Sequence, residues 1–442
     1  MMTDQSKNGI GRTLAGFIRT ESASGLVLIA VTILALVWMN SDLAYLYKSI
    51  WKETKVMIGV GDFVLSESVY HWINDGLMAV FFLLVGLEIK RELIAGELSD
   101  LKKALFPIIA AIGGMVVPAL IYYSINHGHE EFRSGWAIPM ATDIAFSLGI
   151  LTLLGSRVPV ALKVFLTALA IVDDMGAVLS IAIFYSDSIE MLWIAVALAV
   201  FLLLIALNRL GVRKLWAYLI IGIFGLWLPF YLSGVHATIA GVLLALAIPA
   251  SRKIDTVAFN SRIRTLLSDY AASPEEPGNK MLDHHKMQAV SEMHETCDSA
   301  KSPLQWLEHR LKWPTMFLIV PLFALANAGA SFKTHSVTGV VMDPVALGII
   351  LGLVVGKSVG ISLFAWMAVK TRLVSLPDGL QWKHIIGVGF IAGIGFTMSL
   401  FINELAFENS VINEVAKKAI FAGSLISGVI GAALLFLAGR RK

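Results

Sequence analysis

Long apolar stretches separated by short polar ones dominate the chain. A helix needs roughly 20 mainly apolar residues to cross the hydrocarbon core of a bilayer. Stretches of about that length recur throughout the sequence. They predict about twelve transmembrane helices, near residues 22–40, 71–89, 104–124, 135–154, 159–184, 189–208, 214–231, 234–250, 313–330, 344–369, 384–405 and 418–438. The seventh and eighth are short, and we expect Pro229 and Gly234 to break the chain between them.

Composition supports an all-α polytopic membrane protein. The 442 residues are 57% hydrophobic and 15% charged, whereas soluble domains carry about a quarter charged residues. The single cysteine, Cys297, excludes an internal disulfide. Residues 1–19 are polar and no cleavage site follows, so we expect the first apolar stretch to stay as a helix.

The positions of the basic residues predict the orientation. With a cytoplasmic N-terminus, most of the 35 Lys and Arg residues fall in inner segments, which end with Arg440, Arg441 and Lys442. Inner loops of membrane proteins carry such an excess. We therefore expect both termini to be cytoplasmic.

Two connections between the predicted helices are long. The outer one, residues 41–70, contains Val60–Leu65, which predicts a small hairpin with its turn at Gly61-Asp62. A hairpin edge can pair with its copy in a second subunit, so this loop is either a homodimer contact or a plain surface loop.

The cytoplasmic connection, residues 251–312, is the one large insertion that we expect in a single transmembrane domain spanning 1–442. Its centre, 273–280, has linker composition, and its flanks favour amphipathic helices. A metal site is less favoured, because no zinc spacing joins His284, His285, His294 and Cys297. We expect no cofactor and no nucleic-acid partner.

Candidate chemistry centres on Asp173 and Asp174, which lie in the middle of the fifth apolar stretch. A charge at the bilayer centre costs at least ~2.5–3.5 kcal/mol, and such residues face water, a cation or a partner charge. Lys357 is as deeply set in the tenth stretch, too deep to reach an interface, and is a possible partner. The alternative for the two carboxylates is a structural, hydrogen-bonded pair.

The fourth and eleventh stretches are interrupted. The fourth contains Pro139, Thr142 and Asp143, and the eleventh contains several glycines before Thr397 and Ser399. Non-helical backbone at membrane depth survives only inside protein or along a water-filled cavity. Matching interruptions in two three-helix units suggest an inverted repeat with crossed helices (spans 4 and 11). Asp143 and Lys357 are placed to offset the charges of the facing helix ends.

Small residues recur at every fourth position beside Lys357. We expect the ridge of Gly352, Gly356 and Gly360 to press the tenth span against the fifth.

The deep carboxylates and the interrupted spans together could exchange a cation for protons. A hard cation such as Na⁺ prefers oxygen ligands, and Asp174, Asp143, Thr142 and freed carbonyls supply them. Once the cation leaves, burial and mutual repulsion favour protonated carboxyls. Adjacent helical residues point about 100° apart, so one aspartate can face Lys357 while the other faces a cavity.

Six segments resemble the NhaA family of bacterial sodium/proton antiporters: Gly86–Leu93, Ala141–Phe146, Ala170–Asp174, Gly234–Thr238, Pro321–Gly329 and Gly393–Ser399. The resemblance runs from the first span to the last. It implies twelve helices with spans 4 and 11 crossed, and a homodimer in the bacterial cytoplasmic (inner) membrane. It also implies electrogenic exchange of two inward protons per outward Na⁺ or Li⁺, serving sodium and pH homeostasis. Asp174 is then the main ion ligand, Asp173 shares the ion and pairs with Lys357, and Asp143 and Thr142 serve the crossing.

The resemblance also implies a pH-sensing cluster at the cytoplasmic mouth, formed by Glu88, Arg91, Glu92, Glu308 and His309. The sequence departs from the family pattern here at Gln305 and Lys312, and the 251–312 loop is longer. His236 resembles a residue linked to pH response, and a packed or capping histidine is the alternative.

Three other functions compete with antiport. A sodium-coupled symporter of an organic solute needs deep Arg, Asn or aromatic side chains that recognise the solute. The sequence shows no cluster of them beyond the ion site. An intramembrane aspartyl protease would carry a Gly-x-Gly-Asp motif within a transmembrane helix, and none of the predicted spans contains one. A passive channel is disfavoured because a strongly charged, closed site binds ions too tightly to conduct them. We therefore expect a transporter rather than an enzyme.

Overall fold

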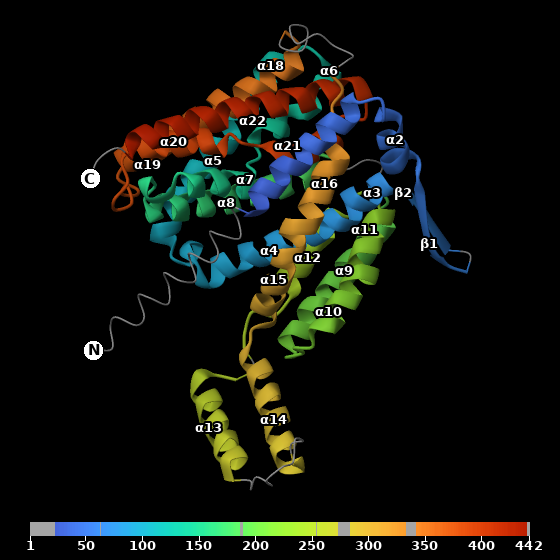
Figure 1. Ribbon diagram of the computed structural model, residues 1–442, viewed down its shortest axis with the longest axis vertical. Coiled ribbons are helices and arrows are strands. Elements are labelled where there is room, and N and C mark those ends of the chain that lie inside the picture. Colours follow the sequence, from blue (N-terminus) through green and yellow to red (C-terminus); the bar gives the residue numbers. More distant parts are fainter. Residues whose placement is uncertain are drawn as a thin grey trace.

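The computed structural model is a bundle of helices with one small hairpin of strands (Figure 1). It describes residues 23–61, 63–185, 189–252, 254–272, 283–332 and 342–439. The polar segment 1–19, Asp62, the linker 273–280 and the basic residues 440–442 lie outside these ranges, so the predictions made for them stay predictions.

The first helix is described over Ala23–Asn40. The later α-helices and the strands are α2 (Ala44–Lys48), β1 (Lys55–Val60), β2 (Phe63–Ser68), α3 (Val69–His71), α4 (Met78–Ala95), α5 (Leu101–Asn126), α6 (Glu130–Arg133), α7 (Ile144–Leu153), α8 (Val160–Phe184), α9 (Met191–Arg209), α10 (Leu215–Gly222), α11 (Leu228–Leu232), α12 (Thr238–Ala247), α13 (Thr256–Ala272), α14 (His284–Ala300), α15 (Pro303–Pro314), α16 (Val320–Asn327), α18 (Pro344–Leu351), α19 (Lys357–Lys370), α20 (Trp382–Ala392), α21 (Phe396–Ala406) and α22 (Ser410–Ala438). Tighter 3₁₀ or wider π turns extend or join several of them, and those used below are η2 (Trp72–Leu77), η4 (Ser134–Met140), η6 (Ile223–Trp227), η7 (Thr315–Ile319) and η8 (Gly352–Gly356).

The described helices include 7 that are long and apolar enough to cross a membrane, or up to 9 if each of two bent pairs is one span. This confirms a polytopic helical membrane protein. Three further predicted spans, near 71–89, 234–250 and 313–330, coincide with η2 and α4, with the short α12, and with η7 and α16. The prediction of twelve spans is neither confirmed nor excluded by helix length.

Both predicted interruptions are present. The segment Glu130–Met140 meets α7 at a bend of 41°, and α20 meets α21 at a bend of 46°. In the first, η4 ends in extended backbone at Ala141, and Asp143 caps α7. In the second, the helix stops at Gly393 and restarts at Phe396. Proline and glycine weaken helices at such points.

Close glycine contacts fix the tenth predicted span against α5, and this corrects one expectation. A Cβ on Gly360 would lie 2.1 Å from the Gly113 carbonyl oxygen, and a Cβ on Gly113 would lie 2.3 Å from the Gly360 carbonyl oxygen. Likewise, a Cβ on Gly356 would lie 2.7 Å from Pro118 Cα. The ridge therefore packs on α5, the third predicted span, and not on the fifth. The expectation was wrong because helical spacing shows which residues share a face but not which helix that face meets.

The junction between the seventh and eighth predicted spans differs in one detail. Pro229 lies inside one continuous helix, because the π turn η6 joins α10 to α11 and the helix runs over Leu215–Leu232. The chain turns instead at Gly234, whose φ of 77° favours glycine.

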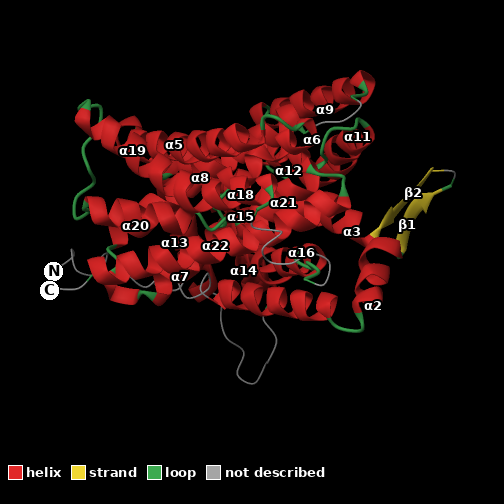
Figure 2. Ribbon diagram, turned by 90° about the horizontal axis from the view of Figure 1, so that it is seen from above, coloured by secondary structure: helices red, strands yellow, loops and turns green. Residues whose placement is uncertain are grey.

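Two hairpins project from the helical body in Figure 1, and Figure 2 shows the hairpin of strands from above. β1 and β2 pair antiparallel from Lys55↔Ser68 to Val60↔Phe63, which confirms the predicted β-hairpin. α13 and α14 form the second hairpin, within the 251–312 connection, and confirm its helical flanks. In the described part of the chain, no three His, Cys, Asp or Glu residues converge as a metal site.

We expect Gly360→Val to destabilise the protein, because overpacking a tight contact costs about 1–3 kcal/mol or more. The thermal midpoint of the purified protein in detergent should fall by several degrees. Gly149→Ala is the matched control, since a Cβ at Gly149 would meet no atom within 4 Å. Equal midpoints for the two variants would contradict this account of the α5–α19 contact.

Candidate ion-binding site

A buried ion pair joins α8 to α19. The Lys357 ammonium donates to Asp173 Oδ2 at 2.5 Å, and both side chains are fully shielded from solvent. The other oxygen of this carboxylate, Asp173 Oδ1, has no hydrogen-bond partner among the described residues. Two opposite charges in one dry site stabilise each other, and either alone would be costly.

Asp174 faces a different space from Asp173. It lines a cavity of about 70 Å³ together with Glu88, Asp143, Thr315 and Thr397. Its Oδ1 atom also has no hydrogen-bond partner in the described structure. The two neighbouring aspartates therefore point apart, as their helical spacing predicts, with one held by Lys357 and the other open to the cavity.

The two interrupted segments bind each other where their helices stop. Thr142 Oγ1 donates to the Ala392 carbonyl at 2.8 Å, and the Asp143 N–H donates to the Ile394 carbonyl at 2.7 Å. In the other direction, Ser399 Oγ donates to the Ile138 carbonyl at 2.7 Å. Carbonyls freed at the breaks thus find donors, as buried backbone requires.

Asp143 caps two helices at once. Its carboxylate accepts from the Phe146 N–H at 3.0 Å, at the start of α7. It also accepts from the Thr397 N–H at 3.1 Å, at the start of α21, and from the Thr397 hydroxyl. Both helix N-termini carry partial positive charge, which a carboxylate offsets. The geometry agrees with the expectation for Asp143. Lys357 instead donates to Asp173, and the carbonyl ends at the breaks receive hydroxyl and N–H donors.

Arg91 forms the centre of the predicted cytoplasmic cluster. Its guanidinium lies 2.6 Å from Glu92 Oε1 and 3.0 Å from Glu308 Oε1. Glu92 also accepts the Glu97 N–H at 2.9 Å, which ties the end of α4 to the following turn. The Arg91 side chain is about a third exposed, so each pair contributes about 1 kcal/mol or less.

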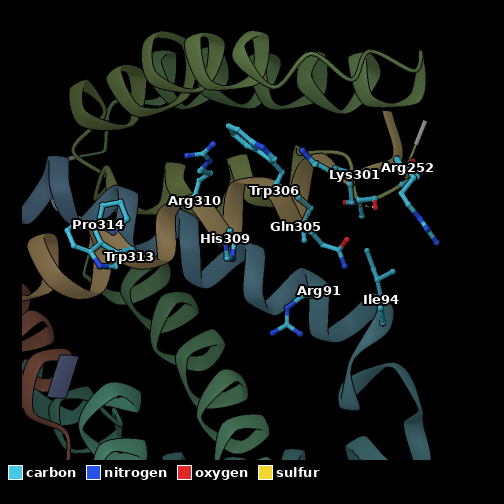
Figure 3. A pocket seen from close by; sticks show the side chains of 16 residues that line it. Arg91, Ile94, Arg252, Lys301, Gln305, Trp306, His309, Arg310, Trp313 and Pro314 are labelled. Atoms are coloured by element: carbon cyan, nitrogen blue, oxygen red, sulfur yellow. Dashed lines mark hydrogen bonds between the residues drawn. The ribbon is translucent and has the colours of Figure 1, made fainter. Parts of the chain in front are cut away.

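A cavity of about 1210 Å³ opens beside this cluster. Figure 3 shows Arg91 and Ile94 from α4 facing it, with Gln305 and His309 from α15 opposite. None of the described residues that line it is acidic, although Glu308 pairs with Arg91 nearby.

Two of the predicted pH-response residues do not line this larger cavity. Glu88 lines the small cavity with Asp174, and it also interacts electrostatically with Glu308, Arg91 and Glu92 of the cluster. His236 interacts electrostatically with Asp75 in η2, at the opposite end of α4. At 1.5 Å per residue, Asp75 and Arg91 are separated by about 24 Å along the helix. Glu88 therefore lies next to the Arg91 cluster, and His236 lies apart from it.

Hydroxyl groups around the site were only partly predictable. Thr397 and Ser399 stand out in the sequence as polar residues at mid-depth, and both bond across the breaks. Thr315 gives no such signal, because it follows Trp313-Pro314 at the edge of an apolar stretch. Its position in the cavity depends on how η7 packs beside α4.

Comparison with known proteins places the chain in a family. It matches the family described as Na⁺/H⁺ antiporter 1 over residues 15–435. The chain belongs to this family. It is 46% identical to the Na⁺/H⁺ antiporter NhaA of Helicobacter pylori strain HPAG1, over 100% of this chain and 99% of that protein. It is 49% identical to the NhaA of Koribacter versatilis over 95% and 90% of the two chains, and 46% identical to that of Oleidesulfovibrio alaskensis over 95% and 92%. The resemblance to NhaA antiporters inferred from the motifs is therefore confirmed, and the family is one of transporters.

Removing one partner of the Asp173–Lys357 pair should destabilise this antiporter by about 3–5 kcal/mol, because the other charge stays buried and unpaired. We expect Lys357→Met and Asp173→Asn each to lower the thermal midpoint strongly, and the double variant to recover most of the loss. Lys383→Met, at an exposed lysine that bonds Ala438, should change stability by about 0.5 kcal/mol or less. Losses that simply add in the double variant would contradict the pairing.

Proposed function

We propose that this chain is an electrogenic Na⁺/H⁺ antiporter that moves Na⁺ or Li⁺ out and two protons in, for sodium and pH homeostasis. Asp173 and Asp174 alternately bind the cation and protons. The observation that carries the proposal is the cavity on Asp174, which has an unpartnered carboxylate oxygen beside the fully buried Asp173–Lys357 pair. The names of the NhaA relatives support the same activity.

The ligands proposed for Na⁺ are oxygens, as a hard cation requires. Asp174 is the main ligand because it faces the cavity, and Asp173 joins it when it leaves Lys357. Asp143 and Thr142 act mainly by holding the two breaks in place, since their polar atoms already bond the opposing segment. No resident metal or cofactor is part of the proposal.

The buried pair offers a source for the second proton. If Na⁺ draws Asp173 away, the Lys357 ammonium is left without its counter-charge at a site with no solvent exposure. Burial disfavours an unpaired charged amine, so Lys357 releases a proton, and Asp174 releases the other. One cation then replaces two protons, which moves net charge.

The membrane arrangement belongs to the same proposal. It has twelve helices in an inverted repeat, with spans 4 and 11 crossed at the breaks, both termini cytoplasmic and the protein in the bacterial inner membrane. The bonds between the two breaks support the crossing. The projecting β-hairpin supports a homodimer formed through residues 41–70. The cluster around Arg91 is proposed to respond to pH at the cytoplasmic mouth, together with Glu88, His309 and His236.

Symport of an organic solute is disfavoured by the size of the site. Cavities that hold drug-sized molecules measure about 300–1,000 Å³, whereas the cavity on Asp174 measures about 70 Å³. That volume suits a small cation with one or two waters.

In everted vesicles, added Na⁺ should collapse a preformed proton gradient, and Asp174→Asn or Asp173→Asn should abolish this response. The asparagine variants keep the side-chain shape and lose the charge. Dequenching of a pH-sensitive dye on addition of Na⁺ or Li⁺ is the measurement. Sodium movement that requires an organic solute and releases no protons would refute antiport.

Lys357→Ala should change the charge moved per cycle, because the variant lacks the proposed second proton carrier. We expect exchange in proteoliposomes to lose most of its dependence on an imposed membrane potential, or to change its pH dependence. A variant with unchanged potential dependence and an unchanged pH profile would remove Lys357 from the mechanism.

A further inference from the structure

The cavity on Asp174 contains a second carboxylate and a hydroxyl group that the proposed ion site does not use. Glu88 and Thr315 both line it, from α4 and η7. Thr315 is only 1% exposed, and its Oγ1 atom has no hydrogen-bond partner among the described residues. A buried hydroxyl without a partner is costly, so this atom calls for an explanation.

Three other helical threonines of this chain show how such a hydroxyl is satisfied within its own helix. Thr32, Thr152 and Thr167 each donate to the carbonyl four residues earlier, at 2.7, 2.8 and 3.0 Å. This back-bonding is the usual arrangement for a threonine inside a helix. Thr315 departs from it at the point where Pro314 and the π turn η7 widen the helix. Such π turns frequently occur at functional sites.

The charges around the cavity favour a cation. Three carboxylates line it, from Glu88, Asp143 and Asp174, and no Lys or Arg is among its described lining residues. Asp143 is satisfied by the N-termini of α7 and α21, which leaves Glu88 and Asp174 sharing a small space. Two like charges in one site disfavour ionisation of both unless a cation lies between them.

We propose that Glu88 and Thr315 form a second cation site, an entry site that holds Na⁺ or Li⁺ before it reaches Asp174. The Glu88 carboxylate supplies the charge and Thr315 Oγ1 a neutral oxygen, and both are ligand types that hard cations accept. A cavity of about 70 Å³ has room for a small ion with one or two waters, at roughly 30 Å³ for each water. Glu88 also interacts electrostatically with Asp174 on one side and, on the other, with the cytoplasmic charges of Lys312, Glu308, Arg91 and Glu92, so it lies between the cytoplasmic cluster and the ion site.

The entry site rests on the proposed antiport function, and Thr315→Val tests it by replacing the hydroxyl with a methyl group of the same shape. Losing one oxygen ligand should raise the apparent KM for Na⁺ and for Li⁺ about two- to tenfold, with the maximal rate within about twofold of wild type. Thr315→Ser keeps the hydroxyl and should keep the KM. Thr152→Val is the matched control, because that hydroxyl bonds its own helix away from the cavity. Initial rates in proteoliposomes against cation concentration give both parameters.

The outcomes separate the entry site from the proposed function. An unchanged KM in Thr315→Val, with Asp174→Asn inactive, overturns the entry site alone. Full activity of Asp174→Asn overturns the ion site whatever Thr315 does. A Thr315→Val variant that loses rate and thermal stability together, and that Thr315→Ser does not restore, shows a structural role and also overturns the entry site.

Glu88→Gln gives a second readout at the same site. Loss of the carboxylate should raise the KM for both cations more than Thr315→Val does, by about tenfold or more, because bonds to charged groups are stronger. An unchanged KM for this variant would also overturn the entry site.

Discussion

The contact between Lys357 and Asp173 is the interaction on which the rest of the site depends. It places a full positive and a full negative charge in the part of the protein where neither is tolerated alone. Lys357 pairs with Asp173, whereas the neighbouring Asp174 lines the cavity. The pair thus gives two chemically identical side chains, adjacent in sequence, different surroundings.

The interrupted helices make room for that arrangement without leaving backbone groups unpaired. Each break frees N–H and carbonyl groups, and the opposing segment supplies partners for them through Thr142, Asp143, Thr397 and Ser399. Most of the polar atoms at the breaks therefore already form hydrogen bonds that hold the two segments together. This explains why a region rich in oxygen atoms leaves few of them without a partner among the described residues, chiefly Asp173 Oδ1, Asp174 Oδ1 and Thr315 Oγ1.

Much of the fold and part of the site were predictable from local patterns. Apolar length located the long helices, and Pro139, Asp143 and the glycines around 393 located both breaks. Asp173, Asp174 and Lys357 were identified by their positions in the middle of apolar stretches. Burying a charge in a membrane is costly whatever surrounds it, so these residues could be singled out before their neighbours were known. The partners of helix faces were not predictable in this way. The Gly352–Gly360 ridge meets α5 rather than α8, and Glu88 lines the cavity on Asp174 as well as interacting with the Arg91 cluster. Both depend on which helices lie side by side, which spacing along one helix does not specify.

The interlocked glycines of α5 and α19 limit how the transporter can move. Each carbonyl sits in the space that the other residue's side chain would fill, so sliding one helix along the other would bring backbone atoms into collision. A side chain at either glycine would therefore force α5 and α19 apart. Lys357 lies one turn before Gly360 on α19, so the spacing of the two helices also sets where its ammonium meets Asp173. The position of the buried charge thus depends on two residues that have no side chain.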